Sequence, residues 1–275
     1  MKRLICIPAI VAILLLTSYS CGNKKARKNT AQTTEQAAVS TEPKWTSIFN
    51  GNDLTGWTIK IPGHELGENF GNTFRVSDSI LSIRYGAYGN NFNERFGALY
   101  YKEEFTNYRL KVEYRFVGET APGGPEWGYR DSGVQYQSQP PATIQLDQQF
   151  PICLEYNLLG GNGTDERPVG DICANGILFQ IDGQQNTTYC TPPTVERTFH
   201  GDQWVTLEID VKDGVISHFI NGEKILTYTN PVYDPSNEIA KTLIKNGDPA
   251  VKSGYISLQS NSHPIDFRKI EIMRY

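Results

Sequence analysis

The sequence predicts an all-β protein in which two antiparallel sheets pack face to face as a sandwich or jelly roll. From Trp45 onward, runs of alternating polar and apolar residues recur, which is typical of half-buried strands. The 275 residues include 25 Gly and 15 Pro, as expected for many short strands joined by turns. Helical periodicity is scarce, so at most one or two short helices are expected, with the best candidate at 237–245.

The clearest strand is 108–116, where apolar residues alternate with charged ones, so one face is predicted to be buried and the other solvated. The dipeptides Asp213-Gly214 and Asn221-Gly222 predict two hairpin turns. Further strands are expected at 204–211, 215–220, 224–228, 255–259 and 265–272. Because neither a repeat nor a break in composition follows, residues 45–275 are predicted to form one domain.

Residues 1–20 are predicted to be a lipoprotein signal peptide, with a basic start, an apolar stretch too short to span a bilayer, and small residues at its end. The segment SYSC at 18–21 resembles a bacterial lipobox, which implies a lipid on Cys21 after cleavage. An ordinary secretory signal is the alternative. Residues 21–44 would then be the lipidated Cys and a flexible linker, because the segment after Cys21 is polar and lacks aromatic residues.

The charge balance and the predicted lipid anchor limit the classes of partner that are expected. With 26 Lys+Arg against 30 Asp+Glu, the net charge is −4, which disfavours nucleic acid as a partner. Membrane contact is expected through the lipid anchor only. An acidic cluster after the lipidated cysteine often marks surface export in Bacteroidota-type lipoproteins. None follows Cys21, so an outer-membrane lipoprotein facing the periplasm is expected.

Three cysteines remain for the folded domain once Cys6 is removed with the signal and Cys21 is lipidated. An odd number allows at most one disulfide. Cys173 and Cys190 bracket a strand-like stretch and are the first choice, although the sequence leaves the pairing among them and Cys153 open. No cysteine or histidine spacing typical of a zinc site is present.

Short motifs in 45–275 resemble, in order, those of one family. They are SIFNGNDLTGW at 47–57, DSGV at 131–134, LEYN at 154–157 and ISLQ at 256–259 with His263. The family motifs read LFNGKDLSGW, N-S-G-V/I, Y-E-x-Q and I-x-L-Q-x-H. This is the 3-keto-disaccharide hydrolase-like family, formerly a domain of unknown function common in Bacteroidota. The resemblance implies a concanavalin-like jelly roll that acts on or binds sugars outside the cytoplasm. Asp131 replaces the Asn of N-S-G-V/I, Asn157 replaces the Gln of Y-E-x-Q, and Lys269 replaces the Asn of a final family motif F-R-N-I.

The chemistry that the resemblance implies is cleavage of a 3-keto-glycoside. The carbonyl acidifies the C2–H, so a base can remove this proton, the C1 aglycone leaves, and water can then add. The site needs a base, a group that stabilises the enolate oxygen, and a proton donor. Glu155 is the candidate base or metal-binding carboxylate, since it lies in an apolar run and would share a strand face with Cys153 and Asn157. An outward-facing or structurally paired Glu155 is the alternative.

His263 is the second candidate catalytic residue, as a proton shuttle or a metal ligand, and an ordinary surface-loop histidine is its alternative. The sequence does not establish a cofactor, and a divalent metal stays an open question. The polar ladder Asp131, Gln135 and Gln137 would bind sugar hydroxyls unless it is simply a solvated strand face. The candidate substrate-binding residues are Arg130, Asp131, Gln135, Gln137, Tyr156, Asn157, Gln259 and Arg268. For Arg268 the competing interpretation is a bridge between strands, and for Tyr156 it is the core.

These observations predict an exported lipoprotein enzyme that cleaves 3-keto-glycosides. The alternatives are a non-catalytic carbohydrate-binding lipoprotein and a structural surface lipoprotein. The enzyme interpretation requires Glu155 and His263 to line one cleft wide enough for a hexose.

Overall fold

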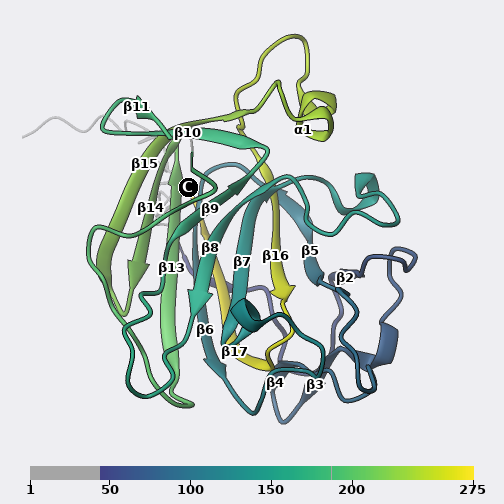
Figure 1. Ribbon diagram of the computed structural model, residues 1–275. Coiled ribbons are helices and arrows are strands. Elements are labelled where there is room, and N and C mark those ends of the chain that lie inside the picture. The colour runs from purple at the N-terminus through teal and green to yellow at the C-terminus, as the bar shows by residue number, and fades with distance from the viewer. Residues whose placement is uncertain (1–43, 187) are drawn as a thin grey trace, which may run out of the picture. The chain divides into compact units, whose positions relative to one another are not determined.

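The computed structural model describes residues 44–186 and 188–275, which form two antiparallel sheets packed face to face (Figure 1). The predicted all-β sandwich is therefore confirmed. The predictions for the signal peptide, for Cys21 and for the linker up to residue 43 lie outside the described residues. Within the described part of the chain, no helix is long and apolar enough to cross a membrane.

The larger sheet has ten strands in the order β11-β10-β15-β14-β13-β6-β17-β4-β3, with β1 paired to β17. The strands are β1 (Thr46–Ser47), β3 (Phe74–Ser77), β4 (Ile80–Ile83), β6 (Tyr108–Phe116), β10 (Ile177–Ile181), β11 (Gln184–Gln185), β13 (Val205–Lys212), β14 (Val215–Ile220), β15 (Glu223–Tyr233) and β17 (Ile265–Arg274). The predicted meander corresponds to β13, β14 and β15. At its turns Asp213 and Asn221 have φ of 50° and 47°, a left-handed conformation that Asp and Asn tolerate well.

The smaller sheet has seven strands in the order β12-β9-β8-β7-β16-β5-β2. They are β2 (Trp57–Lys60), β5 (Gly97–Phe105), β7 (Asp131–Ser138), β8 (Cys153–Leu159), β9 (Ile172–Asn175), β12 (Cys190–Thr191) and β16 (Gly254–Ser260). The short helix α1 (Glu238–Leu243) forms where it was expected, and Asn237 caps it by accepting hydrogen bonds from the backbone of Ile239 and Ala240. Three 3₁₀ turns, at Phe70–Asn72, Glu126–Gly128 and Pro141–Thr143, complete the fold.

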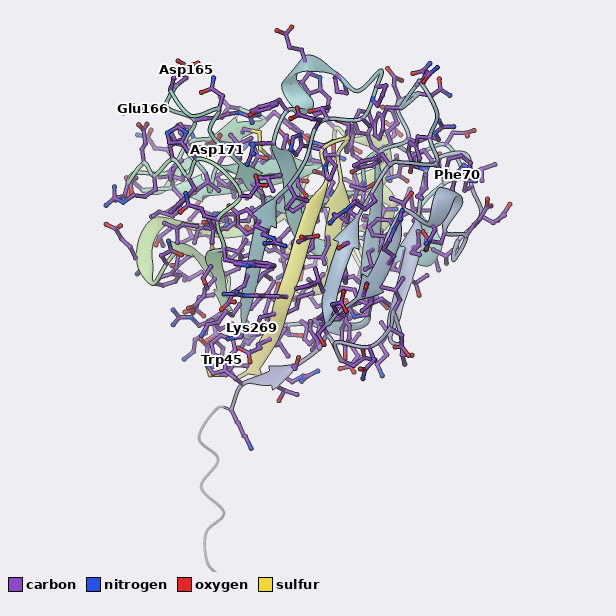
Figure 2. The ribbon with its side chains drawn as sticks, turned by 90° about the horizontal axis from the view of Figure 1, so that it is seen from below. Trp45, Phe70, Asp165, Glu166, Asp171 and Lys269 are labelled. Atoms are coloured by element: carbon purple, nitrogen blue, oxygen red, sulfur yellow. A yellow bond between two sulfur atoms is a disulfide. The ribbon has the colours of Figure 1, made fainter. Side chains whose placement is uncertain are left out.

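The core lies between the two sheets and is made by the alternate residues that face inward. Leu110 and Ile209 of the larger sheet and Val134, Leu154 and Leu258 of the smaller sheet are fully buried there. The opposite face of the larger sheet carries charged side chains. For example, Lys269 pairs with Glu113, and Lys111 Nζ lies 4.2 Å from the Trp45 ring centroid (Figure 2 labels Trp45 and Lys269). The outer face of the smaller sheet carries Asp131, Glu155 and several side-chain amides, and it holds the site.

The disulfide joins Cys173 of β9 to Cys190 of β12, as the sequence favoured, and Cys153 is free and buried. The two bonded cysteines face each other in the β9–β12 ladder. The bond therefore fixes the edge strand β12 to the rest of the smaller sheet.

Candidate functional site

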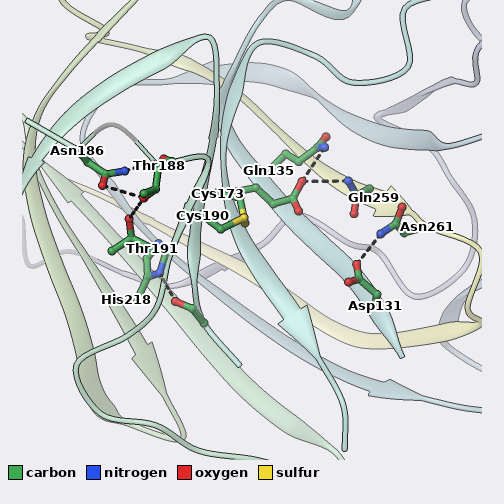
Figure 3. The surroundings of a disulfide bond; sticks show 12 residues. Asp131, Gln135, Cys173, Asn186, Thr188, Cys190, Thr191, His218, Gln259 and Asn261 are labelled. Carbon is green, nitrogen blue, oxygen red and sulfur yellow. Dashed lines mark hydrogen bonds between the residues drawn. A yellow bond between two sulfur atoms is a disulfide. The ribbon is translucent and has the colours of Figure 1, made fainter. Parts of the chain in front are cut away.

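A pocket of about 460 Å³ lies on the outer face of the smaller sheet. Its floor comes from β7, β8, β9 and β16, whose outward-facing side chains are brought together by the strand register. Figure 3 shows the polar part of this surface, with Gln135, Gln259, Asn261 and Asp131 beside the disulfide. The lining residues are Trp127, Asp131, Phe150, Glu155, Asn157, Cys173, Asn175, Tyr189, Cys190, Gln259 and Asn261.

Glu155 is the central acid of this pocket and is only 9% exposed. Its Oε2 accepts a hydrogen bond of 3.0 Å from Gln135 Nε2 and another of 3.0 Å from Gln259 Nε2. Ser257 donates to Gln135 Oε1, which fixes the orientation of that amide. Burial raises the pKa of Glu155 to about 8, against the opposing Gln135 hydrogen bond and with a smaller contribution from the Asp131 charge. Because neutral amides cannot balance its charge, the acid is mostly protonated near neutral pH.

The Glu155 carboxyl lies over Gly133, the glycine of the DSGV segment. A Cβ placed on Gly133 would come within 2.4 Å of the Glu155 carboxyl carbon. Any larger residue would therefore push the carboxyl out of its place between the two glutamines. The glycine is needed at this position for close approach rather than for a turn.

Asp131 is the second acid of the pocket. It accepts a hydrogen bond from Asn261 Nδ2, and its Oδ2 lies 3.5 Å from Arg167 Nη2. Burial raises its pKa to about 7, although the Asn261 hydrogen bond and the Arg167 charge work against the rise. Arg167 also donates to the backbone carbonyls of Trp127 and Arg130. This arginine thus holds together Asp131 and the turn that carries Trp127.

Exposed aromatic side chains border the pocket on two sides. Trp127 is 53% exposed, and its ring stacks on Phe96 with centroids 5.5 Å apart. Tyr189 is 59% exposed, immediately precedes the disulfide residue Cys190, and accepts a backbone hydrogen bond from Ala174. Large exposed aromatic rings beside a polar floor suit the apolar C–H faces of a sugar ring.

Four sequence-predicted residues do line this pocket, namely Asp131, Glu155, Asn157 and Gln259, and Gln135 binds Glu155 directly. The alternation that placed Glu155 on the face of Asn157 was correct. Trp127 also lines the pocket. Asn175, Tyr189 and Arg167 were missed, since each lies in a short strand or an irregular segment that has no periodic signal.

His263 does not reach the pocket, so the expected shared cleft with Glu155 is not found. The imidazole is fully buried; its Nδ1 is 2.9 Å from Thr120 Oγ1, and its ring packs against Phe116 and Tyr129. Burial, with the Arg130 charge, lowers the pKa of His263 to about 4. In the family motif the histidine follows the glutamine by two residues. Asn261 holds that position in this chain, and its side chain is the one that lines the pocket.

Tyr156 and Gln137 are also placed differently from the prediction. Tyr156 neighbours Glu155 on β8, so its ring points to the opposite face and lies in the core, where its hydroxyl donates to the Phe219 carbonyl. The polar ladder holds for Asp131 and Gln135 but not for Gln137. The β7–β16 register shifts beyond Gln135, and Gln137 has φ of 46° and lines a separate hollow.

The two arginine candidates lie outside the pocket lining. Arg130 donates to the Gly201 carbonyl and pairs with Asp202 at 2.7 Å. Arg268 pairs with Glu113 at 2.6 Å on the other sheet, and its guanidinium lies over the Trp204 ring. The bridging alternative is therefore the observed arrangement for Arg268.

Within residues 44–186 and 188–275, no group of three or more His, Cys, Asp or Glu side chains is placed to hold a metal ion. Glu155 accepts a hydrogen bond from the Gln259 amide, and Asp131 accepts one from the Asn261 amide. These donors can bind either the protonated or the ionised form of each acid.

The chain resembles known proteins in two ways, through a family match to its sequence and through solved structures of low identity. No curated protein matches the sequence. A solved structure of a glycosyl hydrolase candidate from Parabacteroides distasonis is 18% identical, with a TM-score of 0.49 and coverage of 84% of this chain and 94% of the other. A carbohydrate-binding module, CBM66 from Bacillus subtilis, is 8% identical, with a TM-score of 0.44 and coverage of 79% and 95%. Residues 44–273 match the family described as the 3-keto-alpha-glucoside-1,2-lyase-like domain, and the chain therefore belongs to that family.

Proposed function

We propose that this protein is an enzyme that cleaves 3-keto-glycosides by base-catalysed elimination in the Glu155 pocket. Family membership supports a carbohydrate-active role. The observation that carries the enzyme proposal is the state of Glu155, a nearly buried acid that only neutral amides hold in place. Both of its hydrogen bonds go to Oε2, which leaves Oε1 available to a substrate in the pocket.

In the proposed reaction the Glu155 carboxylate takes the proton from C2 of the 3-keto sugar. The C2–H bond breaks, a C1=C2 double bond forms, and the C1–O bond to the aglycone breaks. Water can then add, with its hydroxyl going to C1 and its proton to C2, which gives the free 3-keto sugar. The pKa of about 8 makes Glu155 a stronger base than an ordinary glutamate once it is ionised.

Because His263 lies outside the pocket, the proposed reaction does not use it. Asp131 and Asn157, which line the pocket with Glu155, supply the other two functions that the reaction needs. Asp131, whose pKa is raised to about 7, can carry the proton that the leaving oxygen takes up. Asn157 lines the same pocket from β8, and its amide N–H groups can donate to the enolate oxygen at C3. In the reactive state one of the two acids is protonated: Asp131 carries the proton and Glu155 is ionised.

The test is to incubate 3-keto-glucosides with the enzyme in D₂O and follow both C2 deuteration and aglycone release. Glu155→Gln should lower both rates by about 10³-fold. Asp131→Asn should retain deuteration and slow aglycone release, most strongly for poor leaving groups. Glu223→Gln, an exposed strand glutamate on the other sheet, is the matched control. Undiminished turnover in Glu155→Gln, or none in the wild type on several 3-keto-glucosides, would refute the proposal.

A second candidate is a sugar-binding protein without turnover, which the exposed rings of Trp127 and Tyr189 favour. Binding of unoxidised and 3-keto sugars with equal affinity, together with no product from either, would select this function.

We also propose that the protein is exported and anchored by a lipid on Cys21, on the periplasmic side of the outer membrane. The disulfide supports an oxidising compartment. Metabolic labelling with a radioactive fatty acid should mark the wild type and not Cys21→Ala, and the label should fractionate with outer membranes.

A further inference from the structure

A second hollow, of about 800 Å³, lies at the β3–β4 edge of the larger sheet, on the face that points away from the core. It shares no lining residue with the Glu155 pocket. Its lining includes Arg75 and Ser77 of β3, Ser82 of β4, and Arg84, which follows β4. Glu119 and Pro264 come from neighbouring segments.

A row of polar residues crosses the sheet beside this hollow. Arg75 is opposite Ser82, Ser82 is opposite Asp266, and Asp266 is opposite Arg115. Asp266 is 2% exposed, and all of its acceptor capacity is in use. Its Oδ1 accepts from Ser82 Oγ and Arg84 Nη2, and its Oδ2 accepts from Arg115 Nε and Nη2.

Arg75 is the member of this row that lacks an anion. Among the described residues it has no ion pair, and its Nε is buried without a hydrogen-bond partner. Burial lowers the pKa of Arg75, and the like charge of Arg84 lowers it further. The remaining carboxylate of the hollow belongs to Glu119, which is exposed and forms no ion pair in the described part of the chain. A partly buried guanidinium without a carboxylate partner is available to bind an anion from solution.

We propose that this hollow is a second ligand site, which binds the oxyanion of a charged sugar, a carboxylate or a sulfate, through the guanidinium of Arg75. The forked N–H groups of arginine match a planar carboxylate or a sulfate edge. Ser77 and the ring of Tyr85 provide a hydroxyl and an aromatic wall for the remainder of the ligand. The site is independent of the proposed reaction, because it lies on the opposite face of the sandwich.

The test is isothermal titration of the purified protein with glucuronate, inorganic sulfate and glucose. Glucuronate should bind and glucose should not, and Arg75→Gln should weaken glucuronate binding by about tenfold or more. Arg75→Lys should recover part of the affinity. Tighter binding of glucuronate than of sulfate identifies an anionic sugar as the ligand, while equal binding identifies a general oxyanion site.

Arg268→Gln is the matched control, because Arg268 is an exposed arginine on the same sheet that already pairs with Glu113. It should leave binding unchanged. Circular dichroism melting of each variant separates lost binding from lost folding. Unchanged affinity in a folded Arg75→Gln, or no binding of either anion by the wild type, would overturn the proposal, whatever the outcome of the turnover assay.

Discussion

Glu155 and Asp266 are buried carboxyl groups on opposite faces of the sandwich, and their surroundings differ in one respect. Asp266 receives two guanidinium groups, from Arg84 and Arg115, together with the Ser82 hydroxyl. Glu155 receives only the neutral amides of Gln135 and Gln259. Both carboxyl groups accept hydrogen bonds, but the negative charge is balanced only at Asp266.

This difference separates an acid that serves the structure from one that is poised for proton transfer. Opposite charges make the ionised form of a buried acid favourable, while burial among neutral groups favours the protonated form. The raised pKa of Glu155, about 8, follows from the second situation. Such an acid can accept and release a proton near neutral pH.

The largest expected effect is on turnover in Glu155→Gln. If Glu155 is the base, the rate of aglycone release should fall by about 10³-fold, within the range for general base catalysis. The free energy of unfolding should change by less than about 1 kcal/mol, because the acid is already mostly protonated near neutral pH. Urea denaturation and the product assay measure the two quantities. A large loss of stability would make Glu155 a structural acid like Asp266.

Asp266→Asn should show the reverse pattern. Removing this charge leaves Arg84 and Arg115 without their anion, which should cost about 3 kcal/mol of unfolding free energy. Turnover per folded molecule should stay near the wild-type value, since Asp266 lies on the far sheet. Chemical denaturation gives the stability, and the assay is run well below the unfolding midpoint. Lost turnover in a fully folded variant would contradict the division between the two faces.

Gly133→Ala tests whether the position of the Glu155 carboxyl matters as well as its presence. The added methyl group would displace the carboxyl, so turnover should fall by about 10²-fold. Gly163→Ala is a control, because a Cβ there meets nothing within 4 Å and only its φ of 101° is strained. Equal rates for Gly133→Ala and wild type would show that turnover does not depend on the position of the Glu155 carboxyl, which would contradict the proposed reaction.

The smallest effect is the pH dependence of the wild-type rate. The proposed reactive state has one proton shared by Asp131 and Glu155, whose pKa values are about 7 and about 8. The rate should rise with pH as the first proton leaves near pH 7 and fall as the second leaves near pH 8. A pH series of kcat/KM measures both limbs. A rate that keeps rising above pH 9 would remove the acid from the mechanism.

More of the fold than of the site could be predicted from the sequence. The two-residue period of 108–116 and the Asp-Gly and Asn-Gly turns are local signals, and the strands they predicted are present. Glu155 and Asn157 were placed on one face by the same period. The rule failed at Gln137, where a shift in register breaks the alternation, and at His263, which lies in a loop without any period.

By itself, the sequence determined the all-β class, the meander of the larger sheet, the family and the alternation that turns Glu155 away from the core. Each of these depends on residues close together in the chain or on short motifs. The tertiary structure decided which distant groups meet. The pairing of β7 with both β8 and β16 puts Gln135 and Gln259 on Glu155, and Asn261 on Asp131. Burial is a property of that assembly, and it raises the pKa values of the two acids of the pocket.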